Sequence, residues 1–109
     1  MHRAFSFVRD ATRGIFKVRS PRWNEARAEH LKKHPACAAC GAVVNLQVHH
    51  CRPFHLFPEL ELDPHNLITL CEQAGPKGCH LRIGHLGKWR DYNPGVRKTA
   101  ALILAARKH

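Results

Sequence analysis

Two segments of the chain show apolar residues at helical spacing. The first follows Ser20-Pro21, where Ser20 is expected to be the N-cap and Pro21 the first helical residue, and it ends before Pro35. The second follows Asn93-Pro94 and is expected to form a C-terminal helix over residues 94–108. Its core-facing positions recur every three or four residues and are Val96, Ala100, Ile103 and Leu104.

Shorter apolar segments with strand-like patterns lie between these two helices. Residues 46–50 are typical of a short strand, and a second strand is expected from Asn66 to Cys71 after a proline-rich loop. A glycine-rich stretch over residues 73–78 precedes a short helix that is expected to begin near Cys79. Residues 1–19 alternate basic and apolar side chains and are expected to form an arm or a short hairpin. The whole chain, 1–109, therefore predicts one small α+β domain, because it has no length for a second core.

The net charge of +10 is concentrated at the two ends of the chain. Residues 1–33 and residues 81–109 each carry a net charge of +6, whereas residues 34–80 carry −2. Such basic flanks favour a polyanionic partner, with nucleic acid first and an anionic membrane second. The alternative is that the charge only keeps the protein in solution.

Four of the five cysteines form two pairs with metal-ligand character. Cys37-x2-Cys40 has the spacing at which one tight turn places two thiolates on an ion, and Gly41 closes that turn. Cys71 and Cys79 are separated by seven residues, whose glycines and proline allow a bulged loop. We therefore expect a structural four-cysteine zinc site, and Cys51 as a packed thiol outside it. Buried free cysteines and a redox pair are the alternatives, although the redox pair lacks a βαβ context.

Localisation is expected to be cytoplasmic. The start of the chain is charged and does not resemble a signal peptide, and no apolar run reaches the roughly 18–20 residues that would cross a membrane. In a reducing compartment, clustered cysteines are metal ligands more often than disulfides.

Two adjacent histidines end the first strand. Neighbouring strand residues point to opposite faces, so His49 and His50 are expected to have different tasks. One imidazole would bind a metal ion, and the other would move a proton. Further along the chain, Asn66 opens the second strand and His80 directly follows Cys79.

Taken in order, these motifs resemble those of the HNH endonucleases. Val48-His49-His50 with Pro53, then the segment from Asn66 to Cys71, then Cys79-His80, is similar to the HNH motif, and the cysteine pairs are similar to those of its zinc-binding subset, including small phage-type members. The resemblance covers residues 37–85. It implies a ββα-metal (His-Me finger) core with a four-cysteine zinc knuckle and flanking helices, and it implies DNA hydrolysis to 5′-phosphate and 3′-hydroxyl ends.

The resemblance also implies a role for each motif residue. His49 and His80 would bind a divalent catalytic metal (Mg²⁺, Mn²⁺, Ni²⁺ or Zn²⁺), His50 would be the general base, and Asn66 would hold the loop beside the base. His85 is left open, because a gap of five residues places it about 140° around an α-helix from His80, although a kink at Gly84 would bring it back. The structural zinc would fix the start of the helix that carries His80.

The expected partner is DNA, and four arginines of the two basic flanks are expected to contact its phosphates. They are Arg13, Arg19, Arg90 and Arg97. Phage DNA processing or packaging beside terminase subunits is suggested by the resemblance alone. The main alternative is a non-catalytic zinc module that binds nucleic acid, and a toxin-type nuclease with an immunity partner would share the same chemistry.

Overall fold

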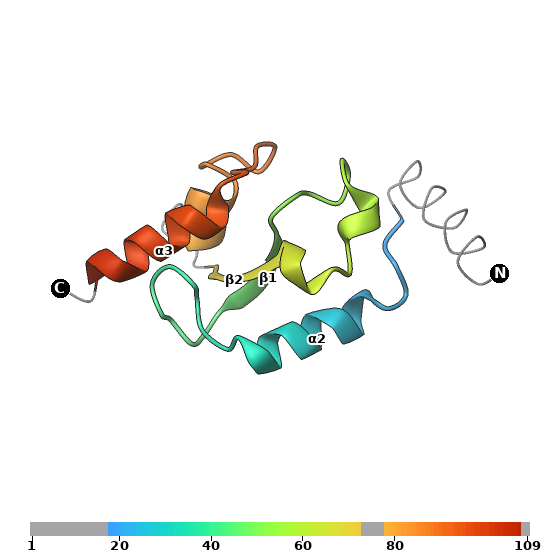
Figure 1. The fold of residues 1–109 in the computed structure, drawn as a ribbon, viewed down its shortest axis with the longest axis horizontal. Helices are drawn as coiled ribbons and strands as arrows, with labels where there is room; N and C mark the ends of the chain where they lie inside the picture. Colours follow the sequence, from blue (N-terminus) through green and yellow to red (C-terminus); the bar gives the residue numbers. More distant parts are fainter. Residues whose placement is uncertain (1–17, 73–77, 108–109) are drawn as a thin grey trace.

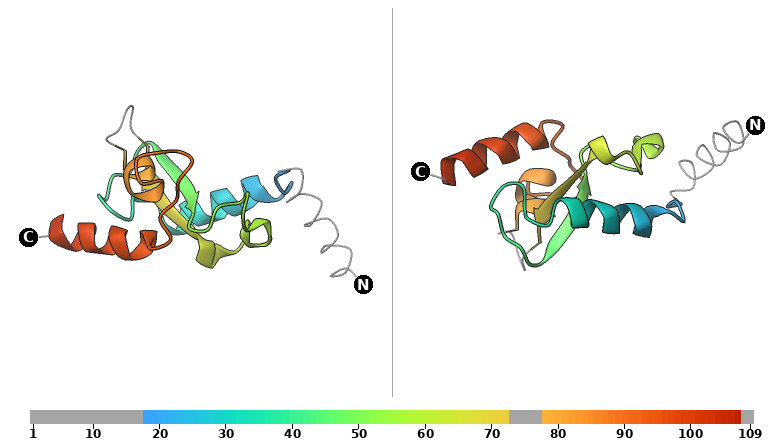
Figure 2. Two further views of the ribbon diagram at one scale, coloured as in Figure 1. Left: turned by 90° about the horizontal axis from the view of Figure 1, so that it is seen from above. Right: turned by 60° about the horizontal axis from the view of Figure 1, so that its bottom comes forward.

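The computed structural model describes residues 18–72 and 78–107 and has an α+β arrangement. Its regular elements are helix α2 (Trp23–Lys33), strands β1 (Leu46–His50) and β2 (Leu67–Cys71), a π-helical turn (His80–Gly84) and helix α3 (Val96–Arg107). Two short 3-10 turns, Pro58–Leu60 and Pro64–Asn66, occupy the loop between the strands. The sheet lies between α2 and α3, with α2 against both strands (Figures 1 and 2). Residues 1–17 of the expected arm (1–19), most of the glycine-rich stretch and residue 108 of the expected C-terminal helix lie outside the described residues.

The sheet is one antiparallel pair. Leu46 pairs with Cys71 and His50 pairs with Leu67, so the end of β1 that bears the histidines meets the start of β2. The strand expected over residues 46–50 is confirmed. The second strand begins at Leu67, one residue later than expected, because Asn66 closes a 3-10 turn and uses its side chain to bond loop backbone.

The core forms around the cysteines. Three of them pack with small and aliphatic side chains into one buried cluster, whose members are Cys37, Ala39, Ile68, Leu70, Cys71, Cys79, Val96 and Ala100. The expected apolar face of α3 is confirmed at three of its four positions, since Val96 and Ala100 are fully buried and Ile103 packs against the cluster, whereas Leu104 is half-buried outside the cluster. A core this small supports only a marginal fold without a further cross-link.

The sequence predicted the residues before α3 better than it predicted the start of α2. The assignment of Ser20 as N-cap is wrong: α2 begins at Trp23 after Arg22, and the Ser20 hydroxyl accepts a hydrogen bond from the Arg22 amide in the preceding turn. The Ser20 amide is held by the Glu61 carboxylate, 41 residues away. Asn93 does lead into α3, since its side chain accepts a hydrogen bond from Gly95 at 2.9 Å.

His30 is a buried polar residue on α2 whose protonation is expected to affect stability. Burial, then the nearby His34 and Arg97, lower the pKa of His30 from 6.5 to about 4. The unfolded chain therefore takes up a proton on His30 at a higher pH than the folded chain does, so this group's contribution to stability is complete above pH 6.5 and is lost as the pH falls toward 4.

The test compares wild type with His30→Gln, because the four clustered cysteines and the histidines of β1 and the π-helical turn are the same in both proteins. Between pH 5 and pH 7, the melting temperature is expected to rise more for wild type than for His30→Gln. Parallel pH profiles for the two proteins would contradict the assignment.

Within the described residues, no helix combines the length and the apolar character needed to cross a membrane.

Candidate metal centres and the cleft beside them

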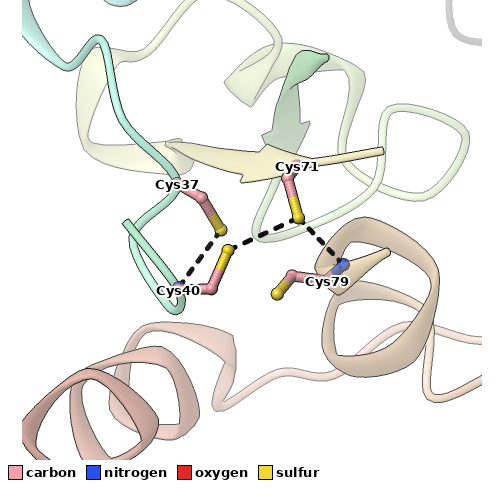
Figure 3. Close-up of side chains that lie close together, drawn as sticks. All are labelled: Cys37, Cys40, Cys71 and Cys79. Atoms are coloured by element: carbon pink, nitrogen blue, oxygen red, sulfur yellow. Dashed lines mark hydrogen bonds between the residues drawn. The ribbon is translucent and has the colours of Figure 1, made fainter. Parts of the chain in front are cut away.

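The four cysteines of the two pairs meet in space and could hold a metal ion such as zinc. Cys37 and Cys40 come from the turn before β1, Cys71 ends β2, and Cys79 precedes the π-helical turn (Figure 3). Their sulfur atoms all lie within 4.8 Å of one another, and none of these cysteines is in a disulfide. Cys51 is not part of this group and packs, half-buried, against the core.

The sulfur spacing suits a tetrahedral ion. The Sγ atoms of Cys40 and Cys71 are 3.6 Å apart, well beyond the 2.05 Å of a disulfide bond. A tetrahedron with zinc–sulfur bonds of about 2.3 Å has edges of roughly 3.8 Å.

Local backbone geometry supports the thiolate form of Cys37. Gly41 closes the turn with φ +80°, and its amide donates to the Cys37 carbonyl. Amides also donate to sulfur, from Cys40 to Cys37 and from Cys79 to Cys71, each at 3.5 Å (Figure 3). Burial opposes ionisation of Cys37, but amide hydrogen bonds outweigh it and lower the Cys37 pKa to about 7. Burial raises the pKa of the Cys40 and Cys79 thiols, so the surroundings favour a thiolate at Cys37 alone, and the other cysteines would lose their protons on binding a metal ion.

Three histidines form a second cluster. One ring nitrogen from each of His49, His80 and His85 lies within 4.8 Å of the others. The ring centroids are 4.8–5.0 Å apart, and the Nε2 atoms of His80 and His85 are 3.3 Å apart. An ion held at about 2.05 Å by tetrahedral imidazole nitrogens separates those nitrogens by roughly 3.3 Å.

The hydrogen bonds around this cluster indicate which nitrogens face a metal. The Asp91 carbonyl can only accept, so His85 donates to it from Nδ1 at 2.8 Å, which leaves the Nε2 lone pair free for an ion. His49 is 3% exposed, and its buried Nε2 has no hydrogen-bond partner. The Glu72 carboxylate lies 3.6 Å from the Nδ1 of His80, on the side away from His85. The Nδ1 of His80 is also buried without a hydrogen-bond partner, so the cluster has two unpartnered nitrogens and one outer nitrogen with an acceptor, which suits metal-binding imidazoles.

A π-helical turn brings His85 into the cluster. The His85 amide bonds the His80 carbonyl at 3.1 Å, which closes a turn over five residues and places the two side chains on the same face. In a regular α-helix, the side chains of His80 and His85 would lie about 140° apart. The alternative prediction, in which a kink at Gly84 brings His85 back toward His80, was therefore the better one. Gly84 makes the turn possible, because a Cβ there would lie only 3.0 Å from Cε1 of His49.

His50 lies outside the cluster, held in one orientation beside it. Its Nε2 is 3.0 Å from the Glu61 carbonyl oxygen, so this nitrogen carries the proton and Nδ1 keeps its lone pair. Its ring packs on Trp23 with centroids 4.6 Å apart. Burial lowers the pKa of His50, with Arg19 acting in the same direction and the Glu61 carbonyl opposing them. His50 is therefore a neutral imidazole at pH 7.

Asn66 joins the two ends of the loop that follows His50. Its side chain accepts from the Arg52 amide at 2.8 Å and donates to the carbonyls of Arg52 and Leu60. Asn66 is 6% exposed, and these bonds satisfy its side chain. This contact pattern agrees with the loop-holding role that the resemblance implied.

His49 and His50, with the other two histidines of the cluster, line one cleft of about 530 Å³. Of the four expected phosphate contacts, Arg19 and Arg90 line it. Arg97 lies elsewhere and donates to the His65 and Leu67 carbonyls, where it ties α3 to the start of β2. Arg13 lies outside the described residues. The lining residues that the sequence did not indicate include the aromatic side chains Trp23, Phe54, Trp89 and Tyr92 and the cation Arg27.

Comparison of the chain with protein-family models, with curated proteins and with solved structures finds no match. By its fold and its side-chain clusters, the protein is a small α+β domain with a possible four-cysteine metal site and a three-histidine cluster.

Proposed function

We propose that this chain is a metal-dependent DNA endonuclease of the HNH type, with a structural zinc on the four cysteines and a divalent catalytic metal on His49, His80 and His85. The observation that supports it most is the pairing of a three-imidazole cluster with a separate neutral histidine, both lining one cleft with three arginines. The proposed core is the ββα-metal arrangement, formed by β1, β2 and the π-helical turn.

The residues of the cleft suit phosphodiester hydrolysis. His50 accepts a proton from the attacking water at Nδ1, while the Glu61 carbonyl holds the opposite ring nitrogen and so fixes the tautomer. Arg19 and Arg90 hold the phosphate strand, and Asn66 keeps the loop beside the base in place. The metal, when bound, supplies charge neutralisation for the phosphate and the leaving oxygen.

A non-catalytic zinc module would account for the cysteines and the charge but not for the second cluster. An end-labelled DNA duplex incubated with Mg²⁺, Mn²⁺, Ni²⁺ or Zn²⁺ separates the two. The nuclease is expected to give metal-dependent fragments with 5′-phosphate ends that DNA ligase rejoins. Stable binding of this duplex and of a single strand of the same sequence, with no cleavage of either in any metal, would instead support the zinc module. Participation in phage DNA packaging beside terminase subunits remains a proposal from the resemblance.

Arg90 provides a test of how the cleft binds DNA. Arg90→Gln is expected to weaken binding to unrelated DNA sequences about equally and to flatten the slope of log K against log salt by about 0.9. Arg107→Gln removes the same charge from the last turn of α3 and is the matched control. Fluorescence anisotropy between 50 and 200 mM salt measures both slopes. Equal slopes for the two variants would remove Arg90 from the phosphate-binding residues.

A further inference from the structure

The cleft has an aromatic side chain at its mouth that the hydrolytic chemistry does not use. Trp89 lies on the segment between the π-helical turn and α3 and is 55% exposed, although it is large and apolar. Its indole contacts two rings of the histidine cluster, with centroids 5.2 Å from His80 and 4.9 Å from His85. Trp89 is therefore fixed on one side and open to solvent on the other.

The segment that carries Trp89 is anchored at both ends. The Gly87 amide bonds the Leu81 carbonyl at 2.8 Å, and the Asn93 amide bonds the Gly84 carbonyl at 3.0 Å (the orange loop before α3 in Figure 1). Lys88 also bonds back to His85 at 3.0 Å. The backbone of the segment is thus held in place, and the ring contacts with His80 and His85 position the indole.

The histidines lie at the bottom of the cleft. His49 and His50 are 3% and 8% exposed, so a phosphate that reaches them must enter the cleft. A volume of about 530 Å³ lies within the range of sites for small molecules and is suited to one nucleotide of a strand. A strand with unpaired bases can bend into such a space, whereas a base-paired strand keeps its phosphates on the outside of a stiff duplex.

We infer that the cleft takes DNA whose bases are unpaired at the cut site, with one base next to the scissile phosphate stacked on the exposed face of Trp89. This inference rests on the proposed nuclease function and names its substrate class. An exposed aromatic ring beside arginines is the combination that binds single strands with little sequence preference, since every base has a flat face to stack. Arg90, the next residue, also lines the cleft and provides the cation.

Trp89 could instead serve only as an apolar cover for the histidine cluster, and a binding measurement without turnover distinguishes these roles. Fluorescein-labelled oligothymidylate and a duplex of equal length are titrated with Trp89→Ala, Trp89→Phe and wild type, each saturated with zinc at the cysteines and with Ca²⁺ in place of a catalytic metal. Leu86→Ala, on the same segment and 53% exposed, is the matched control. Titration of each variant with Mn²⁺ measures the metal affinity of the cluster.

Wild type is expected to bind the single strand more tightly than the duplex. Trp89→Ala should lose about 5- to 150-fold in single-strand affinity and much less in duplex affinity, whereas Trp89→Phe and Leu86→Ala stay close to wild type. Equal losses on both DNAs, no loss, or a lowered Mn²⁺ affinity with unchanged DNA binding would overturn the inference. The proposed function fails separately, by the absence of cleavage of either DNA by wild type in any metal.

Discussion

Cys40→Ser is expected to unfold the protein and to release its zinc. The other three cysteines of the site belong to the buried core cluster, so loss of the ion would leave thiolates in an apolar environment. A structural zinc contributes about 10–16 kcal/mol to folding in small domains, which equals or exceeds the usual net stability of about 5–15 kcal/mol. Elemental analysis and circular-dichroism melts should show less than one zinc per chain and no cooperative transition.

Cys51→Ser is the matched control for this change. Cys51 is half-buried, and its sulfur is not part of the four-cysteine group. The control is expected to keep one zinc per chain and a cooperative melt, with a stability loss of about 1 kcal/mol from the polar hydroxyl. A soluble, cooperatively folded Cys40→Ser protein would rule out a structural zinc on the four cysteines.

His50→Ala is expected to lower DNA cleavage by about 10²- to 10⁴-fold, the usual contribution of a general base. DNA affinity should change little, because in the proposed mechanism the base acts on the attacking water and the arginines hold the strand. Some stability is lost with the Glu61 hydrogen bond, about 1 kcal/mol. Initial cleavage rates measure the loss of activity, and fluorescence-anisotropy titrations on the same DNA measure the affinity.

His65→Ala is the control for His50→Ala, because His65 is an exposed histidine that does not line the cleft. Its cleavage rate should stay within about twofold of wild type, as for most surface changes away from the site. Cleavage by His50→Ala within threefold of wild type would show that another group takes the proton.

Most of the correct predictions depended on the spacing of residues that are close together in the sequence. The strand over residues 46–50 and the apolar face of α3 follow from alternation and helical periodicity, which depend only on near neighbours in the chain. The four cysteines could be grouped for a similar reason, because each pair is close in sequence. The remaining step, bringing the pairs together, is made by β2, which ends at Cys71 beside the turn of Cys37 and Cys40.

The features that the sequence did not predict depend on contacts between residues that are far apart in the chain. His85 joins His49 and His80 through a π-helical turn that packs Gly84 against His49, and no helical periodicity of the segment itself predicts that turn. Helix α2 begins later than predicted, and the Ser20 amide bonds the distant Glu61 carboxylate. Arg97 was expected to contact phosphate, but carbonyls of His65 and Leu67 occupy its guanidinium. Charge alone does not distinguish an arginine that binds the chain from one that faces a ligand.

Cleavage of supercoiled plasmid across a metal series tests the central proposal most directly. Wild type, loaded with zinc at the cysteines, is incubated with Mg²⁺, Mn²⁺, Ni²⁺ or added Zn²⁺, and in parallel with EDTA at a concentration that leaves the structural zinc in place. His80→Ala removes one ligand of the histidine cluster and is assayed beside it. We expect relaxed or linear plasmid with wild type in at least one metal, and intact plasmid with EDTA or with His80→Ala. No cleavage by wild type in any metal, of the plasmid or of a single-stranded circular DNA assayed beside it, would contradict a nuclease built on this cluster, and so would equal cleavage by His80→Ala.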